Sequence, residues 1–188
     1  FHQGLLRHSG VLAVGGDHVS NDLAYGLRIP IGRAEELKLE HGSAVARAES
    51  AGVQVAADTS SLHGGKGIPL EHLERIMSHR VEETLELVAL RLREADALRM
   101  ATAGVFLCGG AARTPRILEV AKRIFQAPVH QGLVQGVSGP ANVLENPEFV
   151  AAIGLLRYGA MRTRQRARPN LLGKLKSLAT FGSRSFLF

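Results

Sequence analysis

Two pairs of glycines follow apolar, strand-like runs, and they are the residues best suited to binding a ligand through the backbone. Gly15-Gly16 follows residues 11–14, and Gly109-Gly110 follows residues 104–108. Because glycine lacks a Cβ, a ligand can lie directly against the chain, and the free N–H groups of a following helix attract anions. A tight strand-to-helix turn explains each pair equally well. The 188 residues contain neither a Walker A loop nor a Gly-x-Gly-x-x-Gly motif, which argues against P-loop and Rossmann sites.

Lys38 lies in a predicted helix over residues 32–41. An ion pair with Glu35 or Glu36 is the ordinary interpretation of such a lysine. We expect no metal site and no catalytic residue, since the eight histidines are scattered and no Cys/His cluster or triad context is present. The one cysteine, Cys108, is interpreted as a small core residue at the end of a buried strand.

The elements that must position these residues alternate between strand and helix patterns, which predicts an α/β layered fold. Strands are expected near residues 5–14, 52–57, 104–108 and 128–130, and the run at 104–108 suits a buried parallel strand. Helices are expected near residues 17–27, 32–41, 70–98, 115–125 and 147–158. Thr114 and Pro115 would supply the cap and first residue of the helix at 115–125.

The net charge of +6 is distributed unevenly along the chain. Residues 149–188 hold eight basic side chains and no acidic one, so residues 1–148 carry fifteen basic against seventeen acidic side chains. The basicity therefore belongs to a tail, and the body is mildly acidic. No run of 18 apolar residues is present to form a spanning helix. The chain opens without Met within a strand-like segment, from which we expect an N-terminal part to be missing.

Four ordered motifs stand out along the chain. They are Gly-Gly-Asp-His-Val-Ser-Asn-Asp-Leu-Ala at 15–24, Ala-Glu-Glu-Leu-Lys at 34–38 with Gly42, Val-Phe-Leu-Cys-Gly-Gly-Ala-Ala at 105–112, and Asn-Pro-Glu-Phe-Val-Ala-Ala-Ile-Gly-Leu-Leu at 146–156. Together they resemble motifs of the FtsA family, the bacterial actin homologue of cell division, over about residues 1–160. The resemblance implies the second, C-terminal half of an actin-like or Hsp70-like ATPase fold. It also implies a partner-binding subdomain inserted at residues 25–100.

The resemblance assigns one set of residues to nucleotide. The expected nucleotide-binding residues are Gly15, Gly16, Glu35, Lys38, Gly109, Gly110, Ala111 and Ala112. The cofactor of the family is ATP, with magnesium, and we expect weak hydrolysis at most. Two phosphate loops of the family have no counterpart in these 188 residues, so we expect half a nucleotide cleft and weak ATP binding. Cys108 and Ala111 also replace the commoner Thr and Gly of the family motif.

The resemblance further implies that the subdomain at 25–100 binds the C-terminal peptide of FtsZ, a tubulin-like polymer. That peptide contains acidic and apolar residues, which favours a basic and apolar receptor surface. Arg75 and Arg80, in the predicted long helix, are the candidates, and ordinary helix-surface arginines are the alternative. The family also implies self-association into filaments.

The tail predicts a membrane anchor. Residues 161–169 alternate arginine with small or polar residues and are expected to form an extended basic linker. Residues 170–188 give a basic amphipathic helix suited to an anionic membrane surface. The expected membrane-contacting residues are Leu171, Leu172, Lys174, Leu175, Lys176, Leu178 and Phe181. A disordered terminus is one alternative, and nucleic-acid binding is disfavoured by the acidic body and the lack of a recognised module.

These expectations combine into a cell-division adaptor that links FtsZ polymers to the cytoplasmic membrane. Such a protein would be cytoplasmic and peripheral on the inner face of the membrane at the division site. The alternative is the C-terminal half of another actin-superfamily ATPase, either a pilus-assembly actin homologue or a sugar-kinase-like enzyme.

Overall fold

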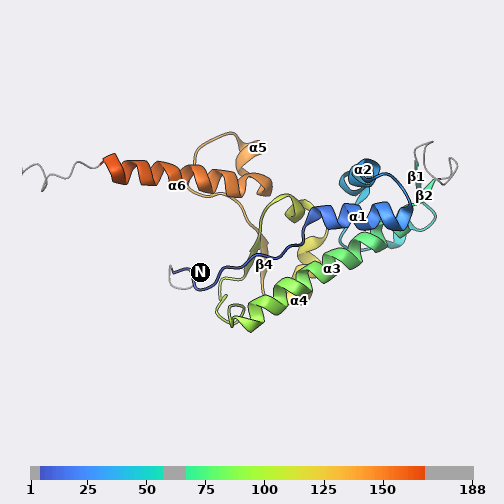
Figure 1. The fold of residues 1–188 in the computed structure, drawn as a ribbon, viewed down its shortest axis with the longest axis horizontal. Coiled ribbons are helices and arrows are strands. Elements are labelled where there is room, and N and C mark those ends of the chain that lie inside the picture. The colour runs from blue at the N-terminus through green and yellow to red at the C-terminus, as the bar shows by residue number, and fades with distance from the viewer. Residues whose placement is uncertain (1–4, 57–66, 168–188) are drawn as a thin grey trace, which may run out of the picture. The chain divides into compact units, whose positions relative to one another are not determined.

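The computed structural model describes residues 5–56 and 67–167, and the chain divides into two compact units, Phe1–Val150 and Ala151–Phe188. Both helices and strands occur, as expected for an α/β protein (Figure 1). The first unit contains α1 (Gly16–Leu27), α2 (Ile31–His41), η1 (Ala48–Ser50), β1 (Gln54–Val55), β2 (Ile68–Pro69), α3 (Leu70–Glu94), β3 (Val105–Leu107), η2 (Gly110–Arg113), α4 (Ile117–Phe125), β4 (Val129–Gln131), α5 (Ala141–Leu144) and η3 (Pro147–Phe149).

The long helix α3 organises the first unit, with α1 and α2 packed at one end and α4 along the other (Figure 1). Val19, Leu23 and Leu27 form the buried face of α1, which confirms the helix predicted near residues 17–27. The buried stripe of α3 continues at helical spacing through Val81, Leu85 and Ala89. Leu87 and Leu90, on the opposite side of that stripe, are exposed.

Four short strands occur among the described residues, but β2 was not predicted, and the strand predicted at residues 5–14 is missing. β1 pairs with β2 in antiparallel fashion, and β3 pairs with β4 in parallel fashion, with Val105 opposite Val129. The parallel pairing confirms the prediction for residues 104–108, but Phe106 is 58% exposed, so this strand is not fully buried. Apart from a single bridge at Leu5, the described residues 5–14 form no strand. A strand requires a neighbouring strand that continues the hydrogen-bond ladder, and beyond the bridge at Leu5 no described segment provides one.

Two helix starts differ from expectation, and a backbone hydrogen bond joins two loops close to one of them. Helix α4 begins at Ile117, after Arg116 in a left-handed conformation, instead of being capped by Thr114. Asn146 accepts a hydrogen bond from Glu148 N, as a cap should, but the turn that it caps is η3. Ala44 N donates to Pro115 O at 2.9 Å, which holds the segment before α4 against the loop that follows α2.

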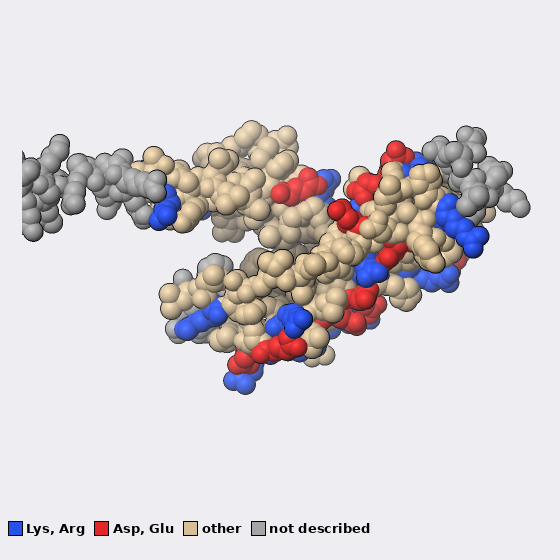
Figure 2. Space-filling view, viewed as in Figure 1, with Lys and Arg blue, Asp and Glu red and all other residues tan. Residues whose placement is uncertain are grey.

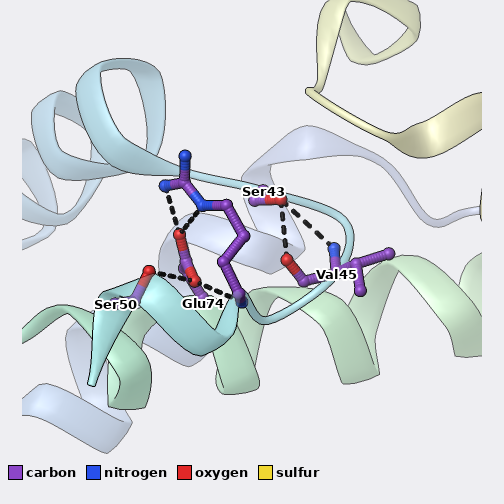
Figure 3. Close-up of polar contacts among 5 residues, drawn as sticks. Ser43, Val45, Ser50 and Glu74 are labelled. Atoms are coloured by element: carbon purple, nitrogen blue, oxygen red, sulfur yellow. Dashed lines mark hydrogen bonds and ion pairs between the residues drawn. The ribbon is translucent and has the colours of Figure 1, made fainter.

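A buried carboxylate fixes the loop after α2 onto α3 (Figure 3). Glu74 is fully buried and accepts hydrogen bonds from Arg47 N (2.9 Å), Arg47 Nε (2.7 Å), Arg47 Nη2 and Ser50 Oγ (2.8 Å). Burial alone would raise the pKa of Glu74, but the hydrogen bonds from Arg47 and Ser50 hold that pKa below its ordinary value. The carboxylate is therefore charged and fully paired inside the fold.

The second unit is described as one helix, α6 (Val150–Ala167). It extends to Ala167, so residues 161–167 are helical, whereas an extended linker was expected over 161–169. Met, Arg and Gln are good helix formers, and this propensity outweighs the charge repulsion among the arginines. Within α6 the Arg162 guanidinium lies 5.7 Å from the centre of the Tyr158 ring, a cation–π contact. The expected amphipathic helix at 170–188 lies outside the described residues.

Candidate functional site

A cleft of about 700 Å³ in the first unit brings together residues from five separate parts of the chain, one of which is Glu148 on η3. The start of α1, the middle of α2, the inner face of α3 and the segment from β3 to η2 all line it. Of the eight residues expected to bind nucleotide, seven line this cleft: Gly15, Gly16, Glu35, Lys38, Gly110, Ala111 and Ala112. The described fold thus assembles the residues that the sequence motifs singled out.

The remaining predicted residue, Gly109, does not line the cleft but shapes its wall. Its φ of +93° lies in a region that side-chain-bearing residues rarely adopt. Gly109 N donates to Pro147 O at 2.8 Å, and Arg113 pairs with Glu148 on η3. These contacts fix the turn between β3 and η2, so that Gly110 can face the cleft.

Gly15 and Gly16, at the start of α1, have open space beside them where a side chain would fit. A Cβ built on Gly15 would meet no atom within 4 Å, and one built on Gly16 would lie 3.6 Å from Lys38 Nζ, an ordinary contact. The Gly15 backbone is extended and suits any residue. Packing within the described chain therefore does not require glycine at either position, and there is room for a ligand to approach the backbone.

The Lys38 ammonium is held by three acceptors. Nζ lies 2.6 Å from Glu35 Oε2, 2.9 Å from Ser20 Oγ and 3.3 Å from Gly16 O. An ammonium has three donors, so all of them are used within the protein. All three Lys38 donors are thus directed at protein acceptors, and its contact with ligand oxygens stays a prediction. The ion pair with Glu35, the alternative considered for Lys38, is present.

Ser20 completes this group and was not identified from the sequence. The hydroxyl is nearly buried, donates to Glu35 Oε2 and lies 3.3 Å from Gly16 O. Hydrogen bonds from Lys38 and then from Ser20 lower the pKa of Glu35. Its spacing of four residues from Gly16 places both on one face of α1, but its contacts with Glu35 and Lys38 depend on the packing of α1 against α2 and leave no signal in the sequence.

Apolar side chains complete the cleft wall. Val19, Met77, Val81, Leu85 and Ile117 all line it, which is the mixture of apolar walls and few polar groups typical of small-molecule sites. Cys108 also lines the cleft and is exposed. The interpretation of Cys108 as a core residue is therefore wrong, because β3 ends at the cleft rim and not inside the core.

The two candidate partner-binding arginines differ in their surroundings. Arg80 pairs with Asp22 on α1 and with Glu83 Oε2 at 2.7 Å. Asp22 first, and then Glu83, raise the pKa of Arg80. Arg75 is exposed, and within the described part of the chain its guanidinium has no ion-pair partner. The Arg80 guanidinium is thus held in the contact between α1 and α3, whereas the Arg75 side chain is exposed and makes no ion pair with a described residue.

On the face drawn in Figure 2, and among the possible metal ligands of the described residues, side chains of one kind do not gather in a cluster. Acidic and basic side chains intermix over α3 and α4 on the face shown in Figure 2, and do not form a continuous basic patch. Within residues 5–56 and 67–167, no group of three His, Cys, Asp or Glu side chains could hold a metal ion. No helix in the same ranges is both long and apolar enough to cross a bilayer.

Sequence comparison decides the family. A family-wide profile described as "Cell division protein FtsA" matches residues 1–154. The chain belongs to the FtsA family. Cell division protein FtsA of Pseudomonas aeruginosa is 32% identical over 162 residues, which is 86% of this chain and 39% of the relative. The FtsA proteins of Rhizobium meliloti and Escherichia coli K12 are 33% and 28% identical, over 84% and 83% of this chain and 36% and 39% of theirs.

The FtsA match supports a cell-division protein and favours it over the pilus-assembly and sugar-kinase alternatives. The chain spans about two fifths of the length of these FtsA relatives. The activity and partners of a whole FtsA protein are therefore proposals for this chain. The predicted membrane residues, from Leu171 to Phe181, lie outside the described part of the structure.

Proposed function

We propose that this chain is the C-terminal part of an actin-like FtsA ATPase fold and contributes one side of its nucleotide cleft. The convergence of Gly15-Gly16, Glu35 and Gly110 to Ala112 on a single cleft is the observation that carries the proposal. The backbone at the glycines can approach a nucleoside closely, and the apolar wall from α3 suits a purine. In this proposal nucleotide controls assembly of a division filament.

The isolated chain is expected to bind ATP more weakly than low-micromolar, because it offers only one wall of the cleft. An NMR titration with ATP would detect such binding through the amide shifts of Gly16 and Gly110. Gly110→Ala is a matched probe, since its new Cβ would lie 4.0 Å from the nearest side-chain atom and would narrow the cleft without strain. Low-micromolar affinity would contradict the half-cleft, and the absence of any shift would contradict a nucleotide site.

We also propose that the surface around Arg75 binds an acidic peptide, the C-terminal tail of FtsZ. Arg75→Glu should weaken that binding by about tenfold or less, the range of a single exposed charge pair. Fluorescence anisotropy with a labelled FtsZ tail peptide measures the change. Arg91→Glu is the control, because Arg91 is also exposed on α3 and lies toward the far end of the helix. Equal loss in both variants would indicate a general charge effect and contradict a site at Arg75.

Arg80 needs a milder substitution because it is held by Asp22 and Glu83. Charge reversal there would bring three carboxylates together and disturb the α1–α3 contact whether or not a peptide binds. Arg80→Gln, together with a thermal melt, separates lost affinity from lost stability. An unchanged affinity would restrict the peptide surface to the exposed side of α3.

A third part of the proposal is membrane attachment through residues 170–188, at the inner face of the cytoplasmic membrane. Leucines with neighbouring lysines suit an interfacial helix, and each basic residue adds about 1 kcal/mol at an anionic surface. The full chain should sediment with anionic liposomes, while a chain ending at residue 169 should remain in the supernatant. Neutral liposomes serve as the control. Equal sedimentation of both chains would remove the anchor from the proposal.

A further inference from the structure

The group formed by Ser20, Glu35 and Lys38 holds more fixed hydrogen bonds than an ordinary surface ion pair. Lys38 Nζ spends its three donors on Glu35, Ser20 and Gly16 O, and the side chain of Lys38 is only 13% exposed. The single Ser20 proton goes to Glu35 Oε2, while the oxygen accepts from Lys38. The three side chains thus form a closed circuit that joins α1 to α2.

This circuit uses only one oxygen of the Glu35 carboxylate. Both hydrogen bonds end on Oε2, and within the described residues Oε1 accepts none. The Glu35 side chain is 44% exposed and lines the cleft. Since the ammonium has no donor left and the carboxylate has a free oxygen, the group can accept hydrogen bonds from a ligand but cannot donate to one. It therefore suits a hydroxyl-bearing part of a ligand and not its anionic part.

We propose that Ser20 is a positioning residue of the cleft, which fixes Lys38 and the Oε2 atom of Glu35 so that Oε1 is presented to hydroxyl donors of the ligand. This inference rests on the proposed nucleoside site. Without the Ser20 hydroxyl, Lys38 regains a donor and Glu35 loses a bond, so the carboxylate can rotate and the ammonium can compete for the ligand. Ser20 is buried, and its hydroxyl contacts both Glu35 and Lys38.

The experiment compares the wild-type 188-residue chain with Ser20→Ala and Ser20→Thr, by NMR titration with adenosine and with 2′,3′-dideoxyadenosine. The wild type should prefer adenosine by about five- to tenfold, the range of one or two hydrogen bonds. Ser20→Ala should lose most of that preference while its affinity for the dideoxy compound stays the same, and Ser20→Thr, which keeps the hydroxyl, should retain it. A preference unchanged in Ser20→Ala would overturn the positioning role.

A second measurement requires no ligand. Carbon-detected titration of the Glu35 carboxyl should give a pKa that is raised in Ser20→Ala relative to wild type and is restored in Ser20→Thr. An unchanged Glu35 pKa in Ser20→Ala would overturn the proposal whatever the ligand titrations show. If neither nucleoside perturbs the wild-type cleft, the nucleoside site itself fails and the role of Ser20 fails with it. If both bind wild type equally, only the inference about Glu35 fails.

Discussion

Replacing Glu74 by alanine should lower the free energy of unfolding by about 3–5 kcal/mol, the cost of breaking a buried, hydrogen-bonded charge pair. The fully buried carboxylate accepts from the Arg47 backbone, the Arg47 guanidinium and Ser50, so its loss leaves several donors without an acceptor. Urea denaturation followed by circular dichroism measures the loss.

Glu86→Ala is the matched control for that substitution. Glu86 lies on the same helix, is exposed, and has no ion-pair partner within the described part of the chain. It should change the free energy of unfolding by less than about 0.5 kcal/mol. A Glu74 variant as stable as the Glu86 variant would show that the buried group contributes little.

The contribution of Glu74 should also depend on pH. Its pKa is lowered by folding from an ordinary value of 4.5, so the folded state favours the charged form. The stabilisation is complete above that ordinary pKa and declines as the pH falls toward the lower pKa of the folded state. The difference in unfolding free energy between wild type and Glu74→Gln should therefore shrink on acidification. A difference that grows below pH 4.5 would contradict the assigned direction.

Gly104→Ala should produce the second large effect, about 2–4 kcal/mol of lost stability. Gly104 begins the approach to β3 with a φ of +90°, and a Cβ there would lie 2.5 Å from Pro128 O. The left-handed conformation costs roughly 1–2 kcal/mol for an alanine, and backbone overlap adds about as much again or more. Thermal melting of the chain reports the sum.

Gly52→Ala separates the two contributions to the Gly104 effect. Gly52 has a φ of +78°, but its added Cβ would meet no atom within 4 Å. Its loss should therefore reflect backbone conformation alone and remain near 1–2 kcal/mol. If Gly52→Ala and Gly104→Ala have the same melting temperature, a small shift of β4 relieves the contact with Pro128 O, and the stability loss expected for Gly104→Ala is too large.

Helical periodicity predicted the parts of the fold that depend on local sequence. The buried face of α1, the extent of α2 and most of α3 follow from apolar spacing and end signals such as Gly42. The strand at residues 5–14 could not be judged in this way, because strand formation depends on a neighbour that the local sequence does not contain. Residues 161–167 were predicted to be extended because arginine alternates there with small or polar residues, but the helix propensity of Met, Arg and Gln favours the helix that is observed.

The candidate site was predictable where backbone chemistry determines it and not where side chains meet across elements. The two glycine pairs identified two of the segments that line the cleft, and the family motif at residues 34–38 identified a third. The saturation of Lys38 and the role of Ser20 depend on how α1 packs against α2, which no spacing within a single helix reveals. The same reason explains Arg80, whose partner Asp22 is 58 residues away in the chain.

Helix α1 carries Ser20 and Asp22 only two residues apart, the first in the cleft group and the second on Arg80. Substitutions at the cleft and at the proposed peptide surface therefore act on one short helix. Their free-energy effects should not be assumed additive, since residues that share a packed element couple by about 0.5–3 kcal/mol. A double-mutant cycle between Ser20 and Arg80 measures that coupling, and its value decides whether ligand data for the two surfaces can be analysed separately.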